Sequence, residues 1–288
     1  MTAQSVPSFD GERAFAILNR VVSFGPRNPN SAGHQECLTY LHQEFAGLAD
    51  SVRIQEFTHR GYNGELLRLR NVIASFRPDE PSRILLCTHW DTRPRADRDS
   101  DPARRNEPML GANDGASGVA VLLELARLFR EAPPPVGVDL VLFDGEDYGL
   151  EGDTPNYLLG SRHFSATKPA DYVPRFGILL DMIGDAQLEI PREGNSMNFA
   201  PDIVELVWET AARLGYRQFA DWTDEPITDD HLPLNAVGIK TIDLIDFSYP
   251  DASHRYWHTH SDTPDKCSAE SLGAVGSVVA HVVYSQSP

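Results

Sequence analysis

Apolar residues recur along the chain with two different periods, and each period predicts a different kind of element. Near the N-terminus they fall three or four positions apart, which is typical of amphipathic helices. Asp10 and Ser31 stand where N-cap residues are expected, and Gly25-Pro26 ends the first of these helices. We therefore expect the chain to open with two helices, whose apolar stripes are Phe15, Leu18 and Val22, and Leu38, Leu41, Phe45 and Leu48.

Strand patterns follow these helices. Val52 to Ile54 and Leu67 to Leu69 alternate with polar residues, as half-buried strands do. Later runs are almost continuously apolar, which is typical of central strands covered on both faces. These runs are 84–88, 138–143, 176–180 and 241–245, and further helix patterns cover 119–129, 203–214 and 272–283. Strands that alternate with helices predict an α/β protein with a mostly parallel sheet.

Ionisable residues follow each of the four buried runs at once. The segments are His89-Trp90-Asp91, Asp144-Gly145-Glu146-Asp147, Asp181 and Asp246. In open α/β sheets, binding sites lie beyond the carboxyl ends of the strands. Aspartate also ends strands as a turn or cap residue, but acidic groups at all four strand ends favour a shared site.

The net charge of the chain argues against two classes of function. Its 288 residues carry 25 Lys and Arg against 42 Asp and Glu, a net charge of −17. This acid excess argues against nucleic-acid binding and against docking on an anionic membrane. No apolar run approaches the roughly 20 residues that cross a bilayer. Met1 to Phe9 lacks the basic and apolar regions of a signal peptide, so we expect a cytoplasmic protein, or a periplasmic or secreted one if an export signal was removed.

Two features are interpreted as structural. Cys37, Cys87 and Cys267 are odd in number and widely spaced, which predicts reduced thiols in the core rather than a disulfide framework or a cysteine-based metal site. The Arg- and Asp-rich segment 93–107 predicts a long surface loop, with a solvated run of charges as the favoured interpretation and a lid as the alternative.

Histidines and carboxylates suited to zinc are spread over separate segments, as a zinc site built by the fold requires. The candidates are His89, Asp91, Asp114, Glu146, Asp147, Asp181 and His258. Asp114 lies in a Gly-rich turn before a helix, Glu146-Asp147 is an acidic pair at a strand end, and His258 lies in Trp-His-Thr-His-Ser-Asp-Thr. No pair has the spacing of HExxH, so spacing alone does not identify a metal site.

Five motifs in this order, from Phe24-Gly-Pro-Arg27 to the last helix, resemble the M28 family of zinc aminopeptidases and their relatives, the glutaminyl-peptide cyclotransferases. The resemblance implies one α/β domain over residues 1–288, with a central mixed, mostly parallel sheet flanked by helices. It assigns Asp114, Asp147 and His258 to the zinc that both branches keep, Glu146 to general acid/base chemistry, and His89 and Asp181 to a second metal in the aminopeptidases. Many members have Glu in place of Asp147, whose shorter side chain still reaches zinc with a small adjustment.

Three features resemble the cyclase branch more than the peptidase branch. They are Asp229-Asp230-His231-Leu-Pro233, Trp257 before His258, and the strings His89 to Pro94, Gly111 to Gly118 and Tyr157 to His163. The resemblance places Asp229 in hydrogen bonds with Glu146 and Asp181, as a catalytic trio, and places Trp257 against the glutamine side chain. We also place His231 and Trp90 at the substrate. The alternatives are ordinary packing for Trp257, a turn cap for Asp229, a supporting role for His231 and a cover over the sheet end for Trp90.

The expected reaction is cyclisation of the N-terminal glutamine of peptides or proteins to pyroglutamate, with one zinc as a Lewis acid and ammonia as the leaving group. Glu146 would carry the proton, and crowding with Asp181 and Asp229 would raise the apparent pKa of the group. The alternatives are a two-zinc aminopeptidase with a bridging Asp114, and a non-catalytic binding module on the same fold. A monomer is expected from the resemblance.

Overall fold

A six-stranded mixed sheet forms the centre of the protein, whose computed structural model describes residues 6–288. Its strands, in spatial order, are β1 (Ser51–Arg60), β2 (Leu66–Phe76), β4 (Gly137–Phe143), β3 (Arg83–His89), β5 (Gly177–Asp181) and β8 (Thr241–Ile245). The pairs β1–β2 and β2–β4 are antiparallel, whereas β4, β3, β5 and β8 run parallel. The expected mixed, mostly parallel sheet is confirmed. The prediction for Met1 to Phe9 lies largely outside the described residues.

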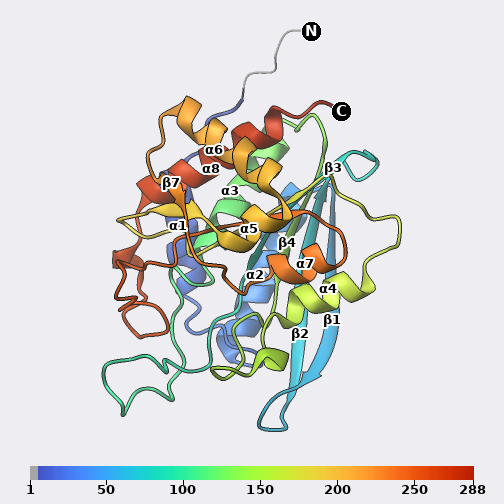
Figure 1. Cartoon of the computed structure of the whole chain (residues 1–288). Helices are drawn as coiled ribbons and strands as arrows, with labels where there is room; N and C mark the ends of the chain where they lie inside the picture. The colour runs from blue at the N-terminus through green and yellow to red at the C-terminus, as the bar shows by residue number, and fades with distance from the viewer. Residues whose placement is uncertain (1–5) are drawn as a thin grey trace.

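Helices cover both faces of this sheet (Figure 1). One face packs on α1 (Gly11–Val22), α2 (Ala32–Leu48), α3 (Ser117–Glu131), α6 (Pro201–Leu214) and α8 (Ala269–Tyr284). The other face packs on α4 (Leu159–Thr167) and α7 (His231–Ala236). Along β3, Ile84 and Leu86 enter the first core, and Leu85 and Cys87 enter the second, since successive side chains of a strand point to opposite faces. Apolar side chains on both faces explain the continuous apolar runs of the central strands.

The long elements agree with the apolar periodicity. Asp10 and Ser31 accept hydrogen bonds from the backbone N–H groups of Arg13 and His34, so both predicted N-caps are confirmed. The sequence did not predict the short elements α4, α7, α5 (Gly194–Phe199), β6 (Ile190–Arg192), β7 (Phe219–Thr223), and the 3-10 turns 154–156 and 264–266. Such short segments carry too few residues for a period to emerge, and tertiary contacts hold them.

Two further expectations concern the core and the surface. All three cysteines are free and buried, as predicted. Among the described residues, no helix combines the length and the apolar character that a membrane span needs.

Candidate active site

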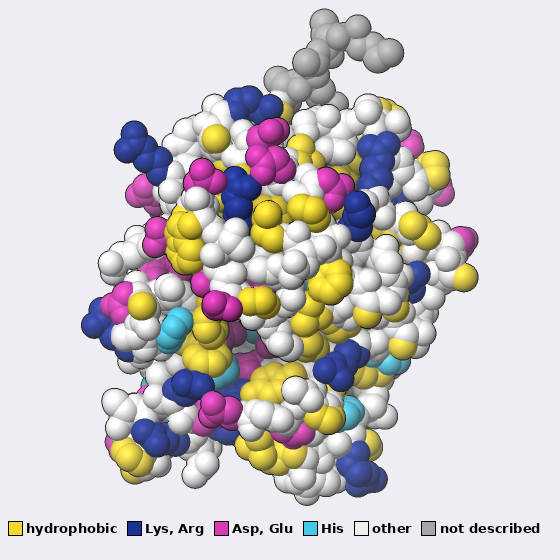
Figure 2. Space-filling view, viewed as in Figure 1, with side chains coloured by type: hydrophobic (Ala, Val, Ile, Leu, Met, Phe, Trp, Pro, Cys, Tyr) yellow, Lys and Arg dark blue, Asp and Glu magenta, His cyan; other side chains and the backbone are white. Residues whose placement is uncertain are grey.

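Strand register brings the predicted residues to one edge of the sheet. His89 ends β3 opposite Phe143, which ends β4, and Asp181 ends β5 opposite Ile245 of β8. A cavity of ≈ 310 Å³ opens at this edge, and Figure 2 shows the hollow, with acidic and histidine side chains inside it. The predicted residues therefore lie together, as expected, because the carboxyl ends of parallel strands meet at the same edge of the sheet.

Two groups of buried side chains can each hold a metal ion. The outer group is Asp114, Asp147 and His258, and the inner group is His89, Asp114 and Asp181. Within each group, one ligand atom from each residue lies within 4.8 Å of the others. Asp114 belongs to both groups, and imidazole and carboxylate groups are the usual zinc ligands outside cysteine sites.

The outer group fits a zinc ion. Nε2 of His258 lies 3.2 Å from Oδ2 of Asp147 and 3.7 Å from Oδ2 of Asp114. Oδ2 of Asp147 is buried and has no hydrogen-bond partner among the described residues. A buried carboxylate oxygen without a donor costs free energy, and a cation between it and His258 would remove that cost. His258 also has φ +56, a left-handed conformation that non-glycine residues adopt at functional sites.

In the inner group, the histidine contacts both aspartates directly. Nε2 of His89 lies 3.0 Å from Oδ1 of Asp181 and 3.2 Å from Oδ1 of Asp114. Burial alone would lower the pKa of His89, but the charge of Asp181 and the hydrogen bonds to Asp114, Asp181 and Asp91 raise it well above its usual range. A protonated His89 can thus bridge Asp181 and Asp114 without a metal.

Two buried carboxylates accept hydrogen bonds from the backbone segments that carry the ligands and so hold these segments in place. Asp91 accepts hydrogen bonds from the N–H groups of Glu146 and Asp147, at 3.0 and 3.4 Å. Asp262 accepts those of Asn113 and Asp114, at 2.8 and 3.1 Å. Asp91, a candidate ligand by sequence, therefore supports the ligand loop and is absent from both metal groups. The role of Asp262 was not predicted, since it lies 148 positions from Asp114.

Gly115 explains the Gly-rich turn that carries Asp114. Its φ is +105, and a Cβ atom at this position would lie 2.4 Å from the carbonyl oxygen of Asp91. Only glycine permits both the backbone conformation and this close approach. The turn is thereby packed onto the strand end, and Asp114 reaches the metal groups.

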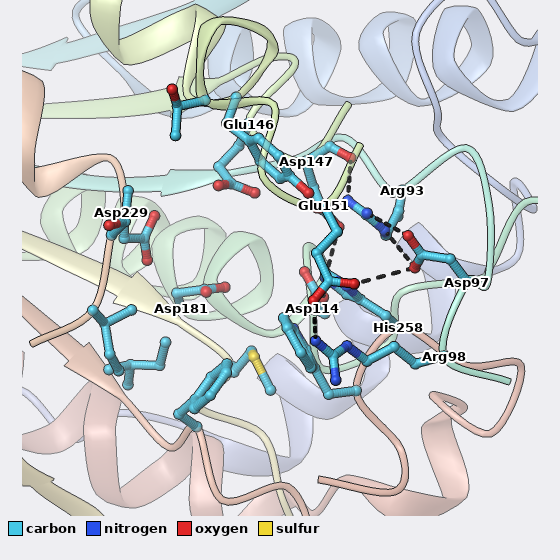
Figure 3. Close-up of a pocket in the computed structure, with 18 of the residues that line it drawn as sticks. Arg93, Asp97, Arg98, Asp114, Glu146, Asp147, Glu151, Asp181, Asp229 and His258 are labelled. Atoms are coloured by element: carbon cyan, nitrogen blue, oxygen red, sulfur yellow. Dashed lines mark hydrogen bonds and ion pairs between the residues drawn. The ribbon is translucent and has the colours of Figure 1, made fainter. Parts of the chain in front are cut away.

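Glu146, Asp181 and Asp229 face the same part of the cavity (Figure 3). Burial and then the charge of Asp147 raise the pKa of Glu146 well above its usual range. Burial and then the charge of Asp181 raise the pKa of Asp229 to about 7. Oδ1 of Asp229 accepts the N–H of Asp230, and Oδ2 has no hydrogen-bond partner among the described residues. The expected hydrogen bonds of Asp229 to Glu146 and Asp181 remain a prediction, and the charge of Asp229 acts on Glu146 as that of Asp181 acts on Asp229.

Of the three predicted substrate contacts, Trp257 lines the cavity, and Trp90 and His231 do not. Trp257 lines the cavity and stacks on His258, with ring centroids 3.8 Å apart. Trp90 is fully buried, stacks on His34 and donates its Nε1–H to the carbonyl of Arg70. A substrate contact for Trp90 was wrong, because the side chain lies behind the sheet edge.

His231 is also absent from the cavity lining. It is fully buried, with Nε2 3.4 Å from Glu193 and Nδ1 3.8 Å from Asp243. A direct substrate contact for His231 is therefore wrong as well, because the ring lies between two carboxylates under the site. Asp243 itself was missed, although a carboxylate within the apolar run Thr241–Ile245 was the available signal.

Comparison with known proteins identifies the family of the chain. The model of peptidase family M28 matches residues 71–283. Aminopeptidase YwaD of Bacillus subtilis is 23% identical over 95% of this chain, and the aligned part is 57% of that protein. A glutaminyl-peptide cyclotransferase-like protein of Bos taurus is 25% identical over 82% of this chain and 66% of its own length. The chain therefore spans less than two thirds of these curated relatives.

A solved structure matches along its full length. The glutaminyl cyclase of Bacteroides thetaiotaomicron bound to N-acetylhistamine is 41% identical and has a TM-score of 0.94. The match covers 98% of this chain and 100% of that one. The chain is thus similar to both aminopeptidases and glutaminyl cyclases.

Proposed function

The chain belongs to peptidase family M28, and on that premise we propose that it is a zinc-dependent glutaminyl-peptide cyclotransferase. It converts the N-terminal glutamine of peptides or proteins to pyroglutamate and releases ammonia. The observation that carries this proposal is Asp229, a third carboxylate buried beside Glu146 and Asp181 and with a pKa of about 7. Three crowded carboxylates retain a proton near neutral pH, which suits a reaction that moves a proton and consumes no water. The full-length similarity to a glutaminyl cyclase supports the same activity.

The reaction joins the α-amine nitrogen of glutamine to its own side-chain carbonyl carbon and breaks the bond from that carbon to the amide nitrogen. Glu146 accepts a proton from the attacking amine and then delivers it to the departing nitrogen, which leaves as ammonia. Asp181 and Asp229 keep the proton of Glu146 available, since their charges disfavour full ionisation of the group. Asp114, Asp147 and His258 would hold the zinc, which would supply Lewis acidity toward the amide carbonyl oxygen.

Apolar side chains orient the glutamine. Trp257, Phe247, Ile227 and Ile245 line the cavity together with the carboxylates. They fit the two methylene groups of the glutamine side chain and exclude water from the reacting amide. The α-amine then lies toward Glu146, and the rest of the peptide leaves through the open end of the cavity.

One zinc, in the outer group, suffices for this reaction. The inner group is linked by the His89–Asp181 hydrogen bond of 3.0 Å, which uses the atoms that would ligate a second ion. Asp181 thereby belongs to the proton-holding carboxylates. No second metal is required, because no hydrolytic water has to be activated.

A two-zinc aminopeptidase is the second candidate. The observation that favours it is Asp114, which belongs to both metal groups and is placed to bridge two ions. Glu146 would then activate a water molecule rather than carry the proton of an amine. The two candidates share every ligand and differ in the number of metals and in the fate of the substrate.

The deciding experiment combines a zinc count with three peptides that begin with Gln, Leu or Asn. We expect one zinc per chain and ammonia release from the Gln peptide alone. The Asn peptide is the matched control, since its cyclisation would need a strained four-membered ring. Two tightly bound zincs together with release of free leucine would overturn the cyclase in favour of the aminopeptidase.

A further inference from the structure

The start of segment 93–107 contacts the outer metal group, although its charges suggested a solvated loop. Arg93, its first residue, has a side chain only 1% exposed. Nη1 of Arg93 donates to Oδ1 of Asp147 at 2.6 Å, and Nε and Nη2 donate to the two carboxylate oxygens of Asp97 at 2.9 and 2.6 Å. Figure 3 shows Arg93 between these two carboxylates, at one end of the cavity that all three residues line. The solvated interpretation is therefore wrong for Arg93.

The hydrogen bond from Arg93 determines which oxygen of Asp147 faces the metal group. Oδ1 accepts the hydrogen bond of the guanidinium, whereas Oδ2 has no hydrogen-bond partner within residues 6–288 and lies 3.2 Å from Nε2 of His258. Nη1 also donates to the backbone carbonyl of Asp147 at 3.3 Å, so backbone and side chain are held by one nitrogen. The side chain of aspartate is short, and its anchored carboxylate keeps Oδ2 directed at the outer metal group.

Asp97 links the same arginine to His258, a second ligand of the outer group. Its Oδ1 lies 3.8 Å from Nδ1 of His258, on the side of the imidazole away from Asp147. The backbone N–H of Arg98 donates to the carbonyl of His258 at 3.2 Å. A histidine ligand whose second nitrogen faces a carboxylate keeps its ring orientation and basicity. Asp97 also balances the charge of Arg93, so the pair orients ligands without adding a net positive charge beside zinc.

We propose that Arg93 and Asp97 are positioning residues of the outer metal centre, which hold Asp147 and His258 in their ligating orientations. The proposal rests on the metal site of the proposed function and not on cyclisation, since an aminopeptidase would use the same ligands. Its failure is therefore visible in zinc affinity, whereas failure of the cyclase proposal is visible in the products.

Zinc affinity, measured by competition with a chromophoric chelator, tests the pair. We expect Arg93→Leu and Asp97→Asn each to raise the zinc dissociation constant by about 10–100-fold, the usual effect of losing a partner of a metal ligand. Arg93→Lys keeps the charge but loses the planar fork, so it should fall between Arg93→Leu and the wild type. The double variant should bind only about as weakly as the worse single variant, because both act through one contact network.

Arg104→Ala is the matched control, since Arg104 belongs to the same segment and forms an exposed ion pair with Glu107. It should leave the zinc dissociation constant unchanged. Melting temperatures of the zinc-free variants separate positioning from folding, because a structural role alone lowers the melting temperature without changing zinc affinity. If Arg93→Leu does not fold, Arg93→Lys and Asp97→Asn carry the test. Wild-type zinc affinity in both of these variants would overturn the proposal.

The visible absorption of the cobalt-substituted protein provides a second readout. A tetrahedral cobalt site absorbs differently from one with a displaced ligand, so Asp97→Asn should change the band shape through His258. An unchanged spectrum in both Asp97→Asn and Arg93→Lys, at full cobalt occupancy, would contradict a positioning role.

Discussion

The two metal groups share Asp114 but differ in how their remaining ligands are held. In the outer group, Oδ2 of Asp147 faces His258 and lacks a hydrogen-bond partner in the part of the chain that the structure describes. In the inner group, Nε2 of His89 is hydrogen-bonded to Asp181 at 3.0 Å. In the outer group, Arg93 holds the other oxygen of Asp147 and leaves Oδ2 facing His258, whereas in the inner group a hydrogen bond joins two of the ligands directly.

This difference indicates that the residue types at a metal site do not by themselves predict how many ions it holds. Both groups contain histidine and aspartate at similar separations. What separates them is the position of Asp229, which brings a further carboxylate to Asp181 and raises the cost of leaving all of them ionised. We expect the extra acid to favour a proton over a second zinc at the inner group.

Replacement of the histidine of each metal group should reveal the largest difference between the two groups. His258→Ala should lose bound zinc and reduce ammonia release from a Gln peptide at least ~10³-fold, because the outer group is left with two carboxylates. His89→Ala should keep one zinc per chain and lose only about 10-fold, through the changed proton balance at Asp181. Zinc content by atomic absorption and steady-state rates measure both effects.

Equal loss of zinc in His89→Ala and His258→Ala would contradict the assignment of different states to the two groups. A wild-type chain with two zincs, reduced to one by His89→Ala, would identify the inner group as an occupied metal site.

Replacement of the proton carrier should have the next largest effect. Glu146→Gln cannot accept the proton of the attacking amine, so kcat should fall by about 10²–10⁴-fold. Zinc should stay bound, because Glu146 belongs to neither metal group. Rates near the wild-type value in a fully zinc-loaded variant would contradict the role of Glu146 in either candidate reaction.

The smallest expected effect concerns stability and pH. The pKa of Asp229 is about 7 in the folded protein and has a reference value of 3.8. The folded state therefore keeps a proton that the unfolded chain releases, and the zinc-free protein loses stability as pH rises from about 4 to about 7. Asp229→Asn cannot ionise, so it should melt roughly 5 °C higher than the wild type at pH 8 and at the same temperature near pH 4.

Scanning calorimetry of the zinc-free proteins at both pH values measures this difference. The exposed Asp171 provides the control, and Asp171→Asn should melt like the wild type at both pH values. A destabilised Asp229→Asn at pH 8 would show that this carboxylate is ionised and stabilising, contrary to the proposed shared proton.

Much of the fold followed from local patterns. The helix over Gly11–Val22 has an aspartate cap and an apolar stripe, and β3, β4, β5 and β8 have continuous apolar runs. The short helix α7 escaped prediction because six residues do not establish a period and because its burial against β8 is a tertiary contact. Trp90 and His231 were misplaced for a related reason, since neighbours of a site in sequence need not face it in space.

The sequence by itself determined the family, the strand ends that carry chemistry and the residues able to bind zinc, because these depend on residue type, order and short-range period. The tertiary structure decided which atoms meet. Asp262 reaches Asp114 from 148 positions away, and Arg93 reaches Asp147 across 54. Such pairs depend on how separate loops converge at the sheet edge, and side-chain orientation there is set by packing and hydrogen bonds that no local pattern encodes. The orientation of Asp147, the proton linking His89 to Asp181 and the burial of Trp90 all belong to this second kind of information.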